Sequence, residues 1–240
     1  MDYVDQPVLE MLKPFARPTT ELSVSNLGPR ANQLPWPPWP ADADRDLAIV
    51  AAKQAEAEGM DAIVVACCAD PHVKDMRANV KIPVVGLMET AVKASSALGK
   101  LSIFPRLLDD SWKIPDHRNW GVWEERAQAY GMSEGDYTLR SIRVPQHPDP
   151  ETFKRLAAED PTKLYEVMIG SMASAFATGG PEQAQSATEE DGATYGWPAC
   201  QYFTTALIEN EDAFKGLRMK VVNPLVAGLT YAEHLLVSTA

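Results

Sequence analysis

Two apolar segments that each end in a cysteine constrain the fold of this chain most strongly. Residues 62–66 lead into Cys67, and residues 192–199 lead into Cys200. A further short apolar segment follows each cysteine: residues 82–86 after Cys67 and residues 219–224 after Cys200. The chain therefore predicts two halves built on one plan, each with a thiol at the C-terminal end of a strand.

Helical periodicity alternates with short apolar runs along the chain, which is typical of an α/β fold with parallel sheets. In such sheets ligands bind beyond the carboxyl ends of the strands, where both cysteines are expected. The predicted helices are 8–15, 46–58, 73–79, 89–98, 120–130, 164–176 and 226–237. The predicted strands are 21–26, 62–66, 84–86, 101–104, 137–144, 192–200 and 221–222. The sequence 178–181, Thr-Gly-Gly-Pro, predicts a helix break, with a short helix or linker over 182–191.

Charge and cysteine content exclude several classes of function. The 240 residues carry a net charge of −11, which argues against nucleic acid or an anionic membrane as partner. Three cysteines, two of them adjacent, make a poor disulfide framework, so a reducing cytosol is expected. No secretory signal or run of about 18 apolar residues is evident, and we expect a cytoplasmic protein.

The segment Asp61 to Pro71, Asp-Ala-Ile-Val-Val-Ala-Cys-Cys-Ala-Asp-Pro, resembles the first cysteine motif of the aspartate/glutamate/hydantoin racemase superfamily. It is most similar to the hydantoin racemase branch, and residues 82–91 resemble the segment that follows there. Residues 191–193 and 222–233 are similar in outline to the second motif around Cys200.

The resemblance implies two pseudo-symmetric Rossmann-like α/β domains with parallel sheets and an active-site cleft between them. The first would comprise residues 1–100 with the returning helix 225–240, and the second residues 101–224. The resemblance also implies catalysis by two thiols without metal or cofactor. One cysteine would act as a thiolate base on one face of an acidic carbon, and the other would protonate the opposite face.

Cys67 and Cys200 are therefore the predicted catalytic residues. Backbone N–H groups after each cysteine are expected to bind a carbonyl or imide oxygen that gains charge as the proton leaves. Arg106 is a candidate partner for a substrate carboxylate, and Trp197 and Tyr202 are candidate walls of the pocket. The predicted substrate-binding residues are Cys68, Ala69, Asp70, Gln201, Phe104, Arg106 and Trp197.

Each of these residues also has a structural interpretation. Cys67 alone would fit a small buried hydrophobe, and strand alternation directs Cys68 to the core. Asp70 suits a cap for the next helix. His72 lies one turn from Cys67 and could tune its pKa, and the structural alternative is a surface histidine. A zinc site of Cys67, Cys68, His72 and Cys200 is a further alternative.

Four parts of the chain depart from the family pattern, one of them Ser102-Ile103-Phe104-Pro105, where the family often has hydroxyl residues that bind an anionic or polar group. Asp5-Gln6-Pro7 is the nearest counterpart of the family's Asn-Pro-Asn-Ser/Thr loop, and Gln201 replaces the usual Thr or Gly. Gly196-Trp197-Pro198 predicts an interruption of the second cysteine strand, because proline removes a ladder donor.

The leading hypothesis is a cofactor-independent racemase or epimerase of a hydantoin-type cyclic amide or related amino-acid derivative. One rival uses the same cleft for thiohydantoin desulfurisation, decarboxylation or isomerisation, and another is a non-catalytic binding protein. The Pro/Trp-rich segment 34–40 and the tryptophans of 112–130 favour a homo-oligomer. The sequence leaves open the substrate's substituent, the preferred hand and the number of subunits.

Overall fold

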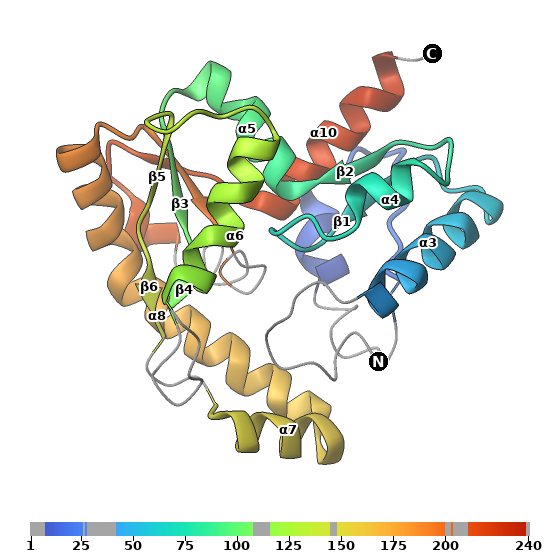
Figure 1. Ribbon diagram of the computed structural model, residues 1–240, viewed down its shortest axis with the longest axis horizontal. Helices are drawn as coiled ribbons and strands as arrows, with labels where there is room; N and C mark the ends of the chain where they lie inside the picture. Colours follow the sequence, from blue (N-terminus) through green and yellow to red (C-terminus); the bar gives the residue numbers. More distant parts are fainter. Residues whose placement is uncertain are drawn as a thin grey trace.

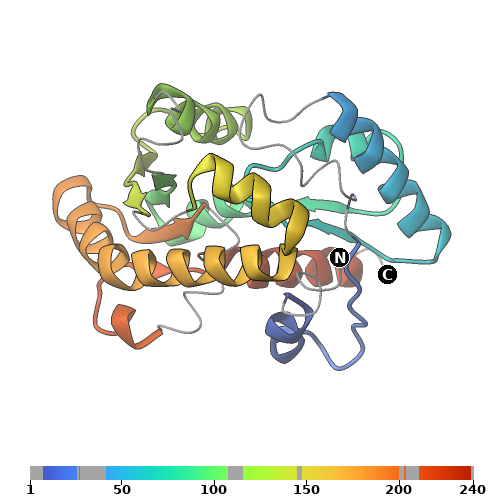
Figure 2. The ribbon, with the colours of Figure 1, turned by 90° about the horizontal axis from the view of Figure 1, so that it is seen from below.

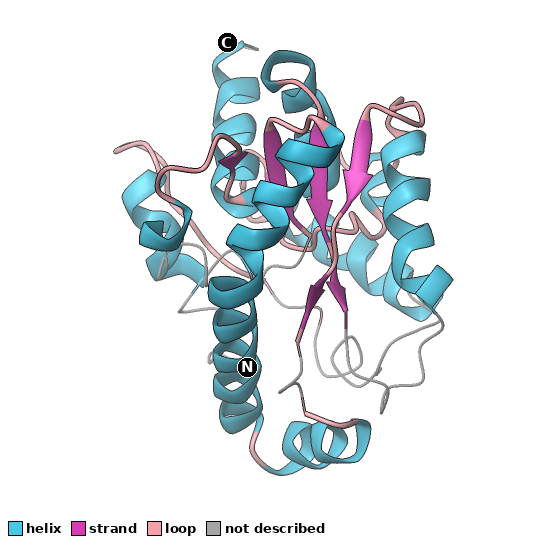
Figure 3. Ribbon diagram, turned by 90° about the vertical axis from the view of Figure 1, so that its left-hand side faces the viewer, coloured by secondary structure: helices cyan, strands magenta, loops and turns pink. Residues whose placement is uncertain are grey.

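Short parallel strands flanked by helices build the molecule (Figures 1 and 3). The computed structural model describes residues 8–25, 27, 42–107, 116–144, 148–199, 203 and 211–238. The predicted α/β class with parallel sheets is confirmed. The α-helices are α3 (Asp42–Ala57), α4 (Val73–Arg77), α5 (Leu87–Leu98), α6 (Asp116–Ala129), α7 (Pro150–Glu159), α8 (Pro161–Asp191) and α10 (Pro224–Ser238). Residues 8–12 are also helical, and the 3-10 helices are η1 (Lys13–Phe15) and η3 (Glu211–Phe214). The strands are β1 (Ile63–Val65), β2 (Val84–Gly86), β3 (Leu101–Phe104), β4 (Arg106–Leu107), β5 (Tyr137–Leu139), β6 (Ile142–Arg143), β7 (Tyr195–Pro198) and β8 (Lys220–Val221).

The first cysteine follows a small two-stranded sheet in which β1 and β2 run parallel. Helix α10 packs against both strands on one side, and α4 contacts β2 and α3 (Figure 1). Ala48 and Ala52 of α3 form a small core with Val73, Met76 and Val84. Helices therefore cover both faces, as a parallel sheet with apolar residues throughout requires.

The second sheet has the strand order β5-β3-β7-β8, with all neighbours parallel. Leu101, Ile103, Tyr195 and Trp197 pack in one core cluster with residues of α5 and α6. Phe104 belongs to another cluster with residues of α8, so both faces of this sheet are also buried. Helix α5 contacts β2, β3 and β7 and thereby joins the two sheets.

The predicted strand 137–144 divides into two, because its neighbour also divides. Pro105 separates β3 from β4, and Arg140 with Ser141 separates β5 from β6. Ile142 donates its N–H to Pro105 O at 2.9 Å. The two neighbouring segments therefore pass together from the sheet of β3 and β5 to the sheet of β4 and β6. The predicted strand 21–26 is wrong for residues 21–25, which have no regular structure, and Asn26 lies outside the described residues.

The predicted break at residues 178–181 is also wrong, because α8 continues through Pro181 and curves along its length (Figure 2). Tertiary packing accounts for the continuity. The Phe176 ring stacks on Phe203 and Phe214, with centroids 5.0 and 4.9 Å away. A Cβ at Gly180 would lie 2.9 Å from Phe214 Cζ, so the glycine lets this ring reach the helix backbone. The proline removes one helical hydrogen bond, and core packing holds the helix on both sides of it. Phe176 before the proline and Ala184 and Ala187 after it belong to one core cluster.

Pro198 does not interrupt the second cysteine strand as predicted. Along β7, Tyr195 and Ala199 donate to β3-side carbonyls, whereas β8 pairs only with Tyr195 and Gly196. Alternate residues of a parallel strand direct their N–H groups to opposite neighbours. The missing donor of Pro198 therefore falls on the β8 side, beyond the last pair of that ladder.

No helix in the described residues is long and apolar enough to cross a membrane. The predicted division into residues 1–100 with 225–240 and residues 101–224 stays a prediction.

Candidate active site

Cys67 lies in a tight loop at the C-terminal end of β1. Its N–H donates to Val65 O at 2.7 Å, and its carbonyl accepts the Asp70 N–H at 3.1 Å. Cys67 is partly exposed, whereas Cys68 is only 2% exposed and packs in the core. The predicted core position of Cys68 is confirmed, but the turn after Val65 places it there and not strand alternation. Cys67, the more exposed residue of the pair, is thus the one predicted to be catalytic.

The loop after β1 touches the end of β7, 130 residues away in sequence. Cys68 Sγ donates to Pro198 O at 3.6 Å. Ala69 and Ala199 belong to the same core cluster, against which Cys67 also packs. The strand end that carries Cys67 and the strand end that leads to Cys200 therefore lie side by side.

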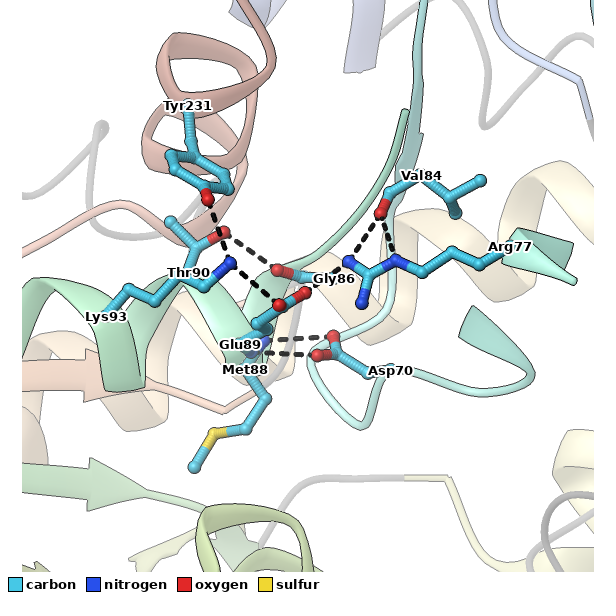
Figure 4. Close-up of polar contacts among 9 residues, drawn as sticks. All are labelled: Asp70, Arg77, Val84, Gly86, Met88, Glu89, Thr90, Lys93 and Tyr231. Atoms are coloured by element: carbon cyan, nitrogen blue, oxygen red, sulfur yellow. Dashed lines mark hydrogen bonds and ion pairs between the residues drawn. The ribbon is translucent and has the colours of Figure 1, made fainter. Parts of the chain in front are cut away.

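Asp70 caps a helix, but not the one that follows it. Its carboxylate is 2% exposed and accepts the Met88 N–H on Oδ1 and the Glu89 N–H on Oδ2, both at 2.9 Å (Figure 4). Burial raises the pKa of Asp70, although the hydrogen bonds from Glu89, Met88 and Tyr130 act in the opposite direction. The Tyr130 pKa is raised as well, by its own burial and then by the charge of Asp70.

A half-buried ion-pair network continues from this cap along α5 (Figure 4). Glu89 accepts a hydrogen bond from Arg77 Nη2 and pairs with Lys93 Nζ at 2.8 Å. Arg77 Nη2 also donates to Val84 O at 2.6 Å, and Lys93 donates to the Tyr231 hydroxyl at 2.8 Å. Burial opposes the charge of Glu89, but the bonds from Arg77 and Lys93 outweigh it and lower the pKa. The network connects α4, α5 and α10 around the end of β2.

Two predicted pocket residues have buried side chains. Trp197 is 0% exposed and packs edge-on against Tyr195, with ring centroids 6.1 Å apart. Phe104 is 1% exposed and packs with Ile142 and Phe176. These positions favour packing as the role of both side chains. Arg106 lies in β4, beyond the end of β3, and its side chain is outside the described part of the structure.

The backbone N–H groups of Ala69 and Asp70, in the loop after Cys67, differ in whether they are already hydrogen-bonded. The Asp70 N–H is used within the turn, so it does not fit the predicted role of donor to a substrate. The Ala69 N–H makes no hydrogen bond to any described residue. His72 is buried rather than on the surface, with a side chain 8% exposed and Nδ1 3.6 Å from Asp75 Oδ2.

Cys200, Gln201 and Tyr202 lie outside the described residues, as do Asp5-Gln6-Pro7, the segment 34–40 and residues 112–115. The described β7 ends at Pro198, and Ala199 N–H donates to Phe104 O at 3.0 Å. Within the described ranges, no group of three or more His, Cys, Asp or Glu side chains is placed to hold a metal ion.

Sequence reasoning missed the Asp70 cap on α5 and the role of Gly86. The predicted helix began at Glu89, but α5 begins at Leu87, directly after β2. Gly86 occupies its N-cap position and has no side chain to offer. A strand that turns into a helix without a capping side chain is the sequence signal that another segment must supply the cap.

Fold and site together define an α/β protein in which a thiol-bearing loop and a second strand end meet at the carboxyl ends of parallel strands. Comparison with known proteins identifies the family that this arrangement resembles. Residues 16–104 match the family model "Asp/Glu/Hydantoin racemase". The predicted resemblance to this superfamily is confirmed.

A hydantoin racemase of Pseudomonas sp. (strain NS671) is 26% identical over 188 residues, which are 76% of this chain and 61% of that protein. A hydantoin racemase of Rhizobium meliloti is 28% identical over 115 residues, or 45% of this chain and 43% of that protein. The chain thus spans less than two thirds of either curated relative. The structure of allantoin racemase from Klebsiella pneumoniae shares the fold, with a TM-score of 0.64 at 19% identity over 99% of this chain and 84% of that one.

Proposed function

We propose that this protein is a cofactor-independent racemase or epimerase of a hydantoin-type cyclic amide or a related amino-acid derivative. Cys67 and Cys200 would be its acid and base. The observation that carries the proposal is the 3.6 Å hydrogen bond from Cys68 Sγ to Pro198 O. It joins the residue after Cys67 to the residue two positions before Cys200, which supports two thiols at one small site.

The chemistry needs no group other than the two thiols and nearby donors. The Cys67 thiolate removes the proton from C5 of the ring. The electron pair of the C5–H bond moves toward the neighbouring carbonyl, which becomes an enolate. The Cys200 thiol then gives its proton to the opposite face of C5, so inversion leaves Cys67 as thiol and Cys200 as thiolate. The ordinary thiol pKa of about 8.5 is close enough to neutral pH for both states to be populated.

The enolate oxygen requires a donor, and the loop offers one. The Ala69 N–H, two residues after Cys67, is not used by any described residue. A backbone N–H that is fixed before reaction stabilises developing negative charge more than water does, because it need not reorient. We assign the Ala69 N–H to this role on the Cys67 side.

The experiment is to incubate the protein with each enantiomer of a 5-substituted hydantoin in deuterated water. Chiral chromatography follows inversion, and proton NMR follows uptake of deuterium at C5. We expect both to proceed faster than in a sample without protein. Allantoin and free amino acids are assayed in parallel to define the substrate class.

Other outcomes would replace the proposal. Sulfide released from a thiohydantoin, or carbon dioxide released from a carboxylated analogue, without C5 exchange would assign the same site to a different reaction. Ligand binding without any turnover would assign a binding protein. Cytoplasmic location and homo-oligomerisation stay predictions from the sequence.

A further inference from the structure

The buried carboxylate of Asp70 connects the Cys67 loop to helix α5. Both of its oxygens accept backbone N–H groups from the first turn of α5, at 2.9 Å each. Gly86, the N-cap residue, makes no side-chain cap for this helix. Most helices obtain this cap from their own N-cap residue. In α5 it comes from Asp70, which lies 17 residues before the first helical residue, Leu87.

The backbone of the loop is strained at the same place. Asp70 has φ of 50° and His72 has φ of 55°, and both lie in the left-handed region that non-glycine residues avoid. Such a conformation is unfavourable and persists only where the surroundings hold it. The Asp70 N–H closes the turn on Cys67 O while its carboxylate binds α5, so one residue fixes both the turn and its anchorage.

Gly86 is needed for this contact. A Cβ at position 86 would collide with the Asp70 carboxylate, at both Oδ2 and Cγ. The Gly86 backbone, with φ of −91° and ψ of 141°, is in the extended region that any residue adopts. The glycine is therefore required by the close approach of Asp70 and not by its own conformation.

We propose that Asp70 is a positioning residue for Cys67: its carboxylate, bound to the start of α5 over Gly86, holds the turn that presents the thiol to substrate. Its activity consequences rest on the proposed racemase function. Because both the N–H and the carboxylate of Asp70 are used within the protein, it acts through Cys67 and does not contact the substrate.

The test uses Asp70→Ala, Asp70→Asn, Gly86→Ala and the Asp70→Ala/Gly86→Ala double variant. A displacement of about 1 Å at a reacting group can cost about 100-fold in rate, so we expect kcat to fall by about that factor in Asp70→Ala. KM should change by less than about threefold, since substrate contacts remain. Asp70→Asn keeps one acceptor oxygen and should retain more activity than Asp70→Ala.

Gly86→Ala probes the same contact from the opposite side. It should lower kcat as Asp70→Ala does, because the new methyl group displaces the carboxylate. In the Asp70→Ala background the collision partner is gone, so the second substitution should change kcat by less than about twofold. A double variant whose loss equals the product of the two single losses would overturn the proposal.

Asp149→Asn is the matched control. Asp149 also caps a helix, accepting the Glu151 and Thr152 N–H groups at 3.0 Å, but it is exposed and belongs to α7. We expect its kcat to stay within twofold of the wild type. An equal loss in Asp149→Asn and Asp70→Asn would mean that only general helix stability is being measured.

Alkylation of Cys67 by iodoacetamide, followed by peptide mass spectrometry, tests the positioning without any turnover. Release of the turn should raise the Cys67 rate at least fivefold in Asp70→Asn and Gly86→Ala while Cys200 changes little. Equal acceleration at all three cysteines, or none at Cys67, would refute the proposal. If the wild type fails to racemise hydantoins, the proposed function fails, and the alkylation rates still decide the role of Asp70.

Discussion

The two strand ends that lead to the cysteines are held in different ways. Strand β1 pairs with only one described strand, β2, and its three residues are half-buried. Strand β7 pairs with β3 and β8, and its four residues are buried. Beyond β1, the loop is anchored by a side chain, Asp70, and beyond β7 the chain is still held by a backbone hydrogen bond from Ala199 to Phe104.

The two strand ends that lead to Cys67 and Cys200 therefore depend on different interactions. At β7 the described backbone hydrogen bonds hold the chain as far as Ala199. At β1 two strands are too few to hold a loop with two left-handed residues, and a buried carboxylate takes over.

The largest expected effect tests whether the thiols are equivalent despite their unequal settings. Cys67→Ala and Cys200→Ala should each lower the rate of racemisation by about 1,000-fold, on the scale of losing a general acid or base. Each single variant should still exchange deuterium into one enantiomer without inverting it. The remaining thiolate removes the C5 proton, the resulting thiol exchanges that proton with the deuterated solvent, and it returns a deuteron to the same face. NMR with each pure enantiomer checks this, and exchange into the same enantiomer in both variants would contradict opposite-face catalysis.

A second prediction concerns stability. Trp197→Ala in β7 removes a fully buried ring and should lower the free energy of unfolding by about 3–5 kcal/mol. Val64→Ala in half-buried β1 should cost only about 1–2 kcal/mol. Urea denaturation measures both, and equal losses would break the contrast between the two strands.

The smallest expected effect is on acid stability. The Arg77 and Lys93 partners lower the pKa of Glu89 despite its burial, so its stabilising contribution is present above the ordinary carboxyl pKa of about 4.3. That contribution is lost as the pH falls through the lowered pKa. Glu89→Gln should cost about 1 kcal/mol at pH 7 and flatten the acid limb of the stability curve.

Thermal unfolding between pH 2.5 and 7 measures this limb. Glu134→Gln is the control, since Glu134 is exposed and forms no ion pair with another described residue. An acid limb as steep in Glu89→Gln as in the wild type would place the acid-sensitive group elsewhere.

Much of the fold followed from local patterns. The strand 101–104 was predicted with the bounds that β3 has. The predicted helix 46–58 ends one residue after the C-terminal residue of α3, Ala57. Gly59 ends that helix with φ of 85°, as a C-terminal glycine cap predicts. These elements were predictable because a buried apolar run or a strong helical period specifies them without reference to distant residues.

The two wrong predictions at prolines share one cause. Pro181 indicated a helix end and Pro198 a strand interruption, but neighbours brought in by the fold decided both. Phe214 packs over Gly180 and holds α8 together, and β8 ends before Pro198 needs to donate. The sequence shows where a proline removes a backbone N–H. It does not show whether a neighbouring segment would have accepted a hydrogen bond from that N–H, or which side chains pack around it.

For the candidate site, the sequence by itself determined which residues carry thiols, that each thiol follows an apolar strand, and that the region resembles a racemase motif. Side-chain chemistry and strand periodicity are local properties, so the chain order contains them. Only the tertiary structure decided that Cys68 contacts Pro198, that Asp70 caps α5, and that Trp197 is core. Those choices depend on which distant segments share a sheet edge or a helix end, and packing of the whole chain fixes them.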